Sequence, residues 1–166
     1  MKNNNAQRIH ERKMREAQNP FARLASTCAA SRKQSQQILQ SIGDLSIVEW
    51  RILWDLIEAG PLTIRELTEI QRNDHSLLSR ALPHMKKKRL VSMQRDTDDG
   101  RQIIVEISDL GHKAYERAAP TMKRRREALN AVYTPQEIVT FIDFIDRLDQ
   151  FLNLPIDTFL EEKDRD

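Results

Sequence analysis

The sequence predicts a mainly helical protein with one small antiparallel β-hairpin. Apolar residues recur at helical spacing over most of the chain, Ser-x-x-Glu and Thr-x-x-Glu segments mark helix starts, and the period changes to two only around residues 91–107. The 166 residues are enough for one ordinary domain with its own core. Because 31% of the residues are charged and no apolar run approaches the ~20 residues of a membrane span, we expect a soluble protein without membrane contact.

The N-terminal part of the chain is polar and then loosely apolar. Residues 1–20 predict a flexible or helical extension that lacks the apolar core of a secretory signal. Residues 21–42 follow as a helix with a polar middle. The single cysteine, Cys28, excludes an intrachain disulfide framework and fits a reducing cytoplasm, where we expect the protein to reside. We interpret Cys28 as a buried core thiol.

Two capping patterns define the next two helices. Ser46 and Glu49 form a capping box at the start of a helix that ends at Gly60-Pro61. Five apolar residues repeat within it at helical spacing: Ile47, Trp50, Leu53, Trp54 and Ile57. Thr63 and Glu66 form a second box, ahead of a short helix whose inward-facing residues are expected to be Ile64, Leu67 and Ile70.

A helix over residues 75–88 follows a turn, with Asp74 as its cap. Its predicted apolar stripe consists of Leu78, Ala81, Leu82 and Met85. The period then changes to two. Val91 and Met93 alternate with polar residues, and so do Ile103, Val105 and Ile107. These segments predict an antiparallel hairpin, in which Asp99-Gly100 supplies the turn.

Two helices complete the prediction. A long helix begins at about Asp109, with Pro120 as an expected kink. The last helix has Thr134 as its cap, Pro135 at its first position and Glu137 closing the box. Its apolar face consists of Ile138, Phe141, Ile142, Ile145, Leu148 and Leu152. Residues 156–166 form an acidic tail.

Short helices joined by a tight turn and followed by a hairpin describe a winged helix-turn-helix. Residues 45–111 resemble the MarR family of transcriptional regulators through the segments "LSIVEWRILWDLIEAGPLTIRELTEI", "DHSLLSRALPHMKKKRLV" and "DDGRQIIVEISDLG". The last segment is similar to the family's wing pattern at Asp99, Arg101, Ile107, Ser108 and Gly111. The resemblance implies a winged-helix DNA-binding lobe over residues 45–108. It also implies a helical dimerisation scaffold over 21–44 and 109–155.

The same resemblance implies a homodimeric, ligand-responsive regulator, most simply a repressor, on a pseudo-palindromic operator. Half-sites would lie about one helical turn apart, roughly 34 Å. A small aromatic or phenolic acid would bind between the scaffold and the DNA-binding lobe and release the repressor. The residues expected near this effector are Arg23, Arg32, Trp50 and Trp54, although packing in the core is an alternative for both tryptophans.

The net charge of +2 hides a basic middle of the chain. Small polar and basic side chains suit a helix that reads base edges, and the corresponding residues are His75, Ser76, Ser79 and Arg80. The cations from Lys86 to Arg89, above all Lys86 and Lys87, could contact phosphates. Arg95 and Arg101 place further cations on the wing, and Asp99 is expected to orient an arginine there. Alternatively, the lysines cap a solvated helix whose macrodipole favours them.

Three residues depart from the family's pattern. Arg89 stands where members commonly have a glycine that closes the recognition helix, the DNA-reading helix predicted here over residues 75–88. The turn after this helix is therefore expected to differ. Pro83 cannot donate a hydrogen bond to the carbonyl of Ser79 inside the same helix. Gly100 stands where a second arginine is common, which predicts a less basic wing tip.

Other classes of function find little support. The sequence contains no nucleophile elbow, no Gly-rich phosphate loop and no acid–base cluster, so we expect no enzyme and no cofactor. The four histidines do not have the spacing of metal ligands. The one kind of metal site that stays open is one assembled from residues far apart in the sequence. Two alternatives remain open: redox sensing through Cys28, and a winged helix that binds protein without DNA.

Overall fold

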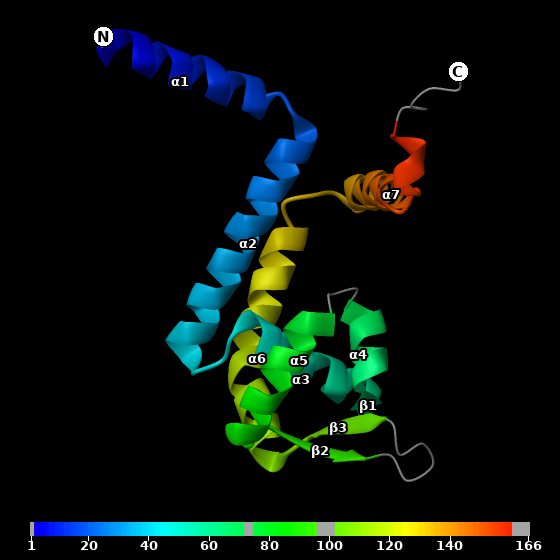
Figure 1. Cartoon of the computed structure of the whole chain (residues 1–166). Coiled ribbons are helices and arrows are strands. Elements are labelled where there is room, and N and C mark those ends of the chain that lie inside the picture. Colours follow the sequence, from blue (N-terminus) through cyan, green and yellow to red (C-terminus); the bar gives the residue numbers. More distant parts are fainter. Residues whose placement is uncertain (1, 72–74, 96–101, 161–166) are drawn as a thin grey trace, which may run out of the picture. The chain divides into compact units, whose positions relative to one another are not determined.

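The structure, a computed structural model, describes residues 2–71, 75–95 and 102–160 and falls into two compact units (Figure 1). The N-terminal unit is Met1–Met122 and the C-terminal unit is Lys123–Asp166. The elements are α1 (Lys2–Ala17), α2 (Pro20–Ile42), α3 (Ile47–Ala59), β1 (Leu62–Thr63), α4 (Ile64–Gln71), α5 (His75–Lys87), β2 (Val91–Arg95), β3 (Ile103–Ile107), α6 (Asp109–Asn130), α7 (Pro135–Leu152) and the 3-10 helix η1 (Ile156–Thr158). The predicted fold class, mainly helical with a small antiparallel sheet, is confirmed.

The sheet contains one strand that the sequence did not predict. Its order is β1-β3-β2 and both pairings are antiparallel. Val105 lies in the central strand β3, where it pairs with Leu62 of β1 and Met93 of β2 and is fully buried. The strand β1 has only two residues, too few for an alternating pattern to show in the sequence.

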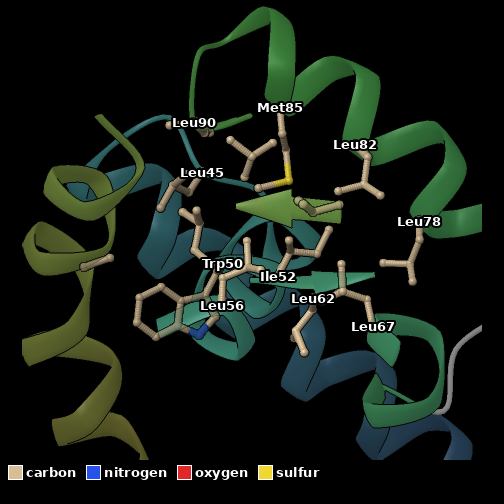
Figure 2. Close-up of a cluster of buried hydrophobic side chains, with 14 of the residues drawn as sticks. Leu45, Trp50, Ile52, Leu56, Leu62, Leu67, Leu78, Leu82, Met85 and Leu90 are labelled. Atoms are coloured by element: carbon tan, nitrogen blue, oxygen red, sulfur yellow. The ribbon is translucent and has the colours of Figure 1, made fainter. Parts of the chain in front are cut away.

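The core of the N-terminal unit surrounds α3 (Figure 2). The residues predicted at helical spacing on this helix are not its whole buried set, because Ile52 and Leu56 are buried as well as Trp50 and Leu53. Helices α2, α4 and α5 and strand β3 all contact α3, which explains why it is covered on more than one side. Burial of each of these side chains stabilises the fold by about 1.5–3 kcal/mol.

The three predicted capping boxes are present. The Ser46 hydroxyl accepts from the Glu49 amide at 3.2 Å while the Glu49 carboxylate accepts from the Ser46 amide at 2.7 Å. Thr63 with Glu66 and Thr134 with Glu137 make the same reciprocal bonds. Asp74, the predicted cap of α5, lies outside the described residues.

One inward-facing residue of α4 was predicted wrongly. Ile70 is half exposed, and Gln71 is buried in its place. Gln71 continues the face of Leu67 one turn later, and its amide donates to Asp55 on α3 at 2.7 Å. Burial raises the pKa of Asp55, an effect that the Gln71 hydrogen bond only partly offsets.

Cys28 is exposed, which corrects the interpretation of a buried core thiol. It belongs to a stretch of α2, residues 25–34, whose side chains are all exposed in the single chain. Only the C-terminal half of α2 reaches the core, where Leu39 is buried. The predicted thiol burial failed because nothing in the described part of the chain covers residues 25–34.

The C-terminal unit has an apolar surface. Helix α7 begins at the predicted Thr134 cap but buries none of its residues. Phe141, Ile142 and Ile145 of the predicted apolar face are exposed. Helix α6 continues past Pro120 to Asn130. No helix in the described part of the chain combines the length and apolar character that crossing a membrane requires.

Candidate nucleic-acid interface

Helix α5 has a buried face and an exposed polar face. Leu78, Leu82 and Met85 are fully buried, and Figure 2 shows them pointing from α5 into the core. Ser76, Ser79 and Arg80 are exposed. Because a one-residue rotation of the helix would expose the leucines, core packing fixes which side chains α5 presents to solvent.

Short hydrogen bonds hold the polar face close to the helix. Arg80 Nε donates to the Ser76 carbonyl at 3.1 Å, and Ser79 Oγ donates to the same carbonyl at 3.1 Å. These bonds direct both side chains toward the N-terminal end of α5. The side chain of His75, the fourth residue predicted for base contact, lies outside the described residues.

Helix α5 ends in a left-handed turn at Arg89. The φ of Arg89 is 59°, in the region that glycine adopts most easily. The Leu90 amide donates to the Met85 carbonyl at 2.9 Å and the Arg89 amide donates to the Lys86 carbonyl at 2.9 Å, which is the hydrogen-bond pattern of a Schellman motif. The turn therefore has the geometry of a glycine turn, although an arginine occupies the position.

Lys88 forms a partly buried connection that the sequence did not predict. Its Nζ lies 3.1 Å from Glu49 Oε1 and donates to the Asp44 carbonyl at 2.8 Å. His84 Nδ1 lies 3.2 Å from the same Glu49 oxygen. Lys88 therefore has partners within the protein, whereas the side chains of Lys86 and Lys87 are exposed. Phosphate contact by Lys86 and Lys87 stays a prediction.

Glu49 remains charged although it is almost completely buried. Burial alone would raise its pKa, but hydrogen bonds from Ser46 and Lys88 outweigh this effect and hold the pKa below its ordinary value. Burial likewise opposes the charge on Lys88, and the carboxylates of Glu49 and Asp44 raise its pKa. Each charge therefore stabilises the other between α3 and α5.

The hairpin is joined to this turn through Ser108 and Gly111. Ser108 Oγ donates to the Arg89 carbonyl, and the Ser108 amide donates to the Leu90 carbonyl at 3.1 Å. A Cβ added to Gly111 would lie only 2.1 Å from the Leu90 carbonyl oxygen. Ser108 and Gly111, two residues of the wing pattern, therefore hold the end of β3 and the start of α6 against the end of α5.

The structure brings Lys86 of α5 and Arg95 of β2 to one surface. Both line a shallow hollow of about 290 Å³ between the helix and the hairpin, together with Pro83, Met93 and others. Both side chains are exposed. Asp99 and Arg101, predicted as wing support and wing cation, lie outside the described residues, as do Asp96 and Asp98.

Of the four residues predicted for an effector pocket, the two tryptophans are neighbours. Trp50 is buried and stacks on Tyr115 with ring centroids 4.9 Å apart. Trp54 lies 6.4 Å from Trp50 and donates its indole N–H to Glu58 at 3.2 Å. Arg23 and Arg32 are exposed on α2. The aromatic cluster packs within the N-terminal unit, and the role of these four residues in ligand binding stays a prediction.

Metal binding finds no support in the side chains that the structure describes. Over residues 2–71, 75–95 and 102–160, no three His, Cys, Asp or Glu side chains gather closely enough to hold an ion.

Comparison with known proteins identifies the same architecture. Residues 43–102 match the model of the MarR family. The chain is 31% identical over 98 residues to the HTH-type transcriptional repressor IacR of Pseudomonas putida, an alignment that covers 59% of this chain and 58% of IacR. Its fold is similar to that of PcaV from Streptomyces coelicolor, solved with its natural ligand (TM-score 0.68, 19% identity, 81% of this chain and 94% of PcaV). It is also similar to that of a mutant MarR from E. coli complexed with operator DNA (TM-score 0.67, 19% identity, 78% and 93%).

These findings agree with the elements described above. The matched residues include α3, α4, α5 and the first strand of the hairpin, which form the helix-turn-helix and the start of its wing. The family and these relatives are transcriptional regulators and not enzymes, which confirms the prediction that the chain is not an enzyme. In the sequence of residues 43–102 and in its fold, the chain is similar to the MarR family of winged-helix regulators.

Proposed function

We propose that the protein is a sequence-specific regulator of transcription that binds double-stranded DNA, acting as a homodimeric repressor. The observation that carries this proposal is the exposed face of α5, which presents Ser76, Ser79 and Arg80 beside the cations Lys86 and Lys87. A single helix fits the major groove, and side chains of these types bind base edges and phosphates. The relatives support the same role, since IacR is named a repressor and the MarR structure contains operator DNA.

The exposed apolar surface of the C-terminal unit supports a homodimer. Its exposed large side chains include Val139, Phe141, Ile142, Phe144, Ile145, Phe151 and Leu152. An apolar surface of this extent is costly in water, and a second copy of the same helix would cover it. Two-fold symmetry would then present two α5 helices to the half-sites of a pseudo-palindromic operator.

A small aromatic or phenolic acid is the proposed effector that releases the repressor. PcaV, whose fold this chain shares, was solved with its natural ligand. The exposed thiol of Cys28 favours redox sensing as a second candidate signal. Treatment with hydrogen peroxide distinguishes the two: a redox sensor releases its DNA on oxidation, and a Cys28→Ser variant does not.

Selection from a random duplex pool, followed by salt titration of the selected duplex, tests the DNA proposal. Each phosphate neutralised by a cation contributes about −0.9 to the slope of log K against log salt concentration. We expect a steep negative slope and preference for one pseudo-palindrome. A flat slope with selected and random duplexes alike would refute DNA binding and would favour the alternative of a winged helix that binds protein.

A further inference from the structure

Helix α1 has no covering surface within the described part of its own chain. All of its described side chains, residues 5–17, are exposed, including the apolar Ile9 at 48% and Met14 at 51%. Only two residues, Gln18 and Asn19, join it to α2. In proteins most of the stability of a helix comes from packing and not from its own backbone. An ordered helix that buries none of these side chains therefore indicates a partner surface.

One face of α1 carries three arginines. Arg8, Arg12 and Arg15 recur at spacings of four and three residues, which places them on one side of the helix. Arg12 lies 3.1 Å from Glu16, whereas Arg8 and Arg15 form no ion pair with any residue that the structure describes. The arginine face is about 10.5 Å long, since an α-helix rises about 1.5 Å per residue. Two guanidiniums without a carboxylate indicate an acidic partner.

Helix α7 has a face with the same spacing and the opposite charge. Val139, Asp143 and Asp146, here called the acidic face, also recur at four and three residues. Asp143 lies 3.8 Å from Arg147, and Asp146 forms no ion pair within the described ranges. Val139 is 60% exposed and does not belong to the predicted apolar face of α7. A homodimer contact through the apolar face therefore leaves the acidic face available.

We propose that α1 docks on the acidic face of α7 in a second copy of this chain. The inference rests on the homodimer of the proposed function, and it adds a helix that lies outside the predicted scaffold. Among residues 5–17, four lysines and arginines stand against two carboxylates, whereas α7 has four carboxylates and one arginine. Opposite charges at matched spacing attract, and they also fix the register of the two helices.

Nucleic acid, the other anionic partner in the proposed function, fits α1 less well. Helix α2 rises roughly 28 Å between Pro20 and Leu39. Leu39 is where α2 enters the core around α3, and α1 is attached at the Pro20 end. Helix α1 is therefore distant from the face of α5 that is proposed to read DNA. The half-exposed Ile9 and Met14 also suit a protein surface, because phosphates offer apolar side chains no apolar area to bury.

Sedimentation equilibrium of the full-length protein without DNA tests the contact by charge reversal. Arg8→Glu combined with Arg15→Glu should weaken dimerisation about tenfold at low salt, because attractions become repulsions. Asp143→Lys combined with Asp146→Lys should do the same. All four substitutions together should return the dissociation constant to within about threefold of the unmodified protein, as expected for residues in contact. Lys13→Glu, on another side of α1, is the matched control and should change nothing.

Amide hydrogen exchange provides a second readout and shows which partner α1 has. Residues 5–17 should be protected in the unmodified dimer, and the two arginine reversals should remove that protection. A dimer in which affinity and exchange ignore the reversals would overturn the inference and leave the proposed function standing. A monomer at every concentration would refute the homodimer and this inference together. Reversals that weaken binding to DNA or to phosphatidylglycerol vesicles, with dimerisation unchanged, would assign α1 to those partners and overturn the contact with α7.

Discussion

Lys88 Nζ lies 3.1 Å from Glu49 Oε1, and this ion pair joins the end of α5 to the first turn of α3. The Glu49 side chain is only 4% exposed, whereas that of Lys88 is 25% exposed. Glu49 also accepts the Ser46 amide hydrogen bond, so one carboxylate both caps α3 and holds the end of α5. The pair is therefore part of the framework that presents α5, and its loss should be measurable as stability.

Lys88→Met should lower the free energy of unfolding by about 2 kcal/mol, because it leaves the buried Glu49 carboxylate without its main cation. Urea unfolding with an unchanged m-value measures the effect. Lys87→Met is the matched control, since the Lys87 side chain is exposed, and we expect a change within about 0.5 kcal/mol. Equal stability of the two variants would contradict the structural role of Lys88.

The lowered pKa of Glu49 predicts a loss of stability in acid. The folded protein holds the proton on Glu49 less tightly than the unfolded chain does. The contribution of Glu49 to the free energy of unfolding is therefore fully present above the pKa of the unfolded chain, about 4.3. It is lost as the pH falls through the lower pKa of the folded protein. Glu49→Gln should unfold more easily at pH 6 and should lose less stability between pH 6 and pH 3.5 than the unmodified protein.

Chemical denaturation at a series of pH values measures this difference. Glu69→Gln, which replaces an exposed carboxylate of α4, should follow the unmodified protein across the range. Parallel stability curves for Glu49→Gln and the unmodified protein would show that Glu49 contributes nothing to the pH dependence.

Gly111→Ala should destabilise the protein by about 3 kcal/mol, because the added Cβ would overlap the Leu90 carbonyl oxygen at 2.1 Å and the backbone must move. The comparison variant is Gly43→Ala. A Cβ there meets only Arg117, at 3.9 Å, and should change stability by less than about 1 kcal/mol. Thermal unfolding of both variants measures the contrast, and a similar small effect at the two glycines would contradict it.

Arg89→Gly should stabilise the protein by about 0.5–1 kcal/mol. A left-handed conformation costs a residue with a Cβ about 1–2 kcal/mol, and the greater freedom of glycine in the unfolded chain offsets part of that gain. Lys86→Gly, three residues earlier within the helix, should instead destabilise by about 1 kcal/mol. Urea unfolding should show opposite signs for these two variants, and the same sign for both would mean that the left-handed turn carries no strain.

Features that depend on neighbours along the chain could be predicted from the sequence. Each capping box lies within four consecutive residues, so Ser46 with Glu49 and Thr134 with Glu137 could be predicted directly from the sequence. The buried stripe of Leu78, Leu82 and Met85 follows from helical spacing in the same way. Because this stripe also fixes the exposed face of α5, the orientation of Ser79 and Arg80 followed from local patterns.

Features that depend on distant segments could not be predicted. The pairing of Lys88 with Glu49 spans 39 positions and looks, in the sequence, like one more cation in a lysine run. The strand β1 forms only because β3 lies beside it, and Gln71 is buried because Asp55 accepts its hydrogen bond. Cys28 is exposed because no segment in the described part of the chain covers this stretch of α2. A local sequence pattern contains no information about such distant packing.

Arg80→Ala tests the proposed base contact. Removal of a guanidinium that binds a base edge should cost about 1–3 kcal/mol on the selected duplex and much less on random duplexes, so discrimination falls. The hydrogen bond from Arg80 Nε to the Ser76 carbonyl leaves the terminal guanidinium nitrogens available for the base. Fluorescence anisotropy with both duplexes, at several salt concentrations, measures the two affinities.

Lys87→Ala provides the contrast on the same helix. An exposed lysine that contacts phosphate should lower affinity for selected and random duplexes alike and should reduce the salt slope by about 0.9. If Arg80→Ala also weakens binding to selected and random duplexes equally, Arg80 contacts a phosphate and other residues of α5 contact the bases. If only the selected duplex is weakened, the exposed face of α5 reads sequence through Arg80, because a phosphate contact cannot distinguish one duplex from another.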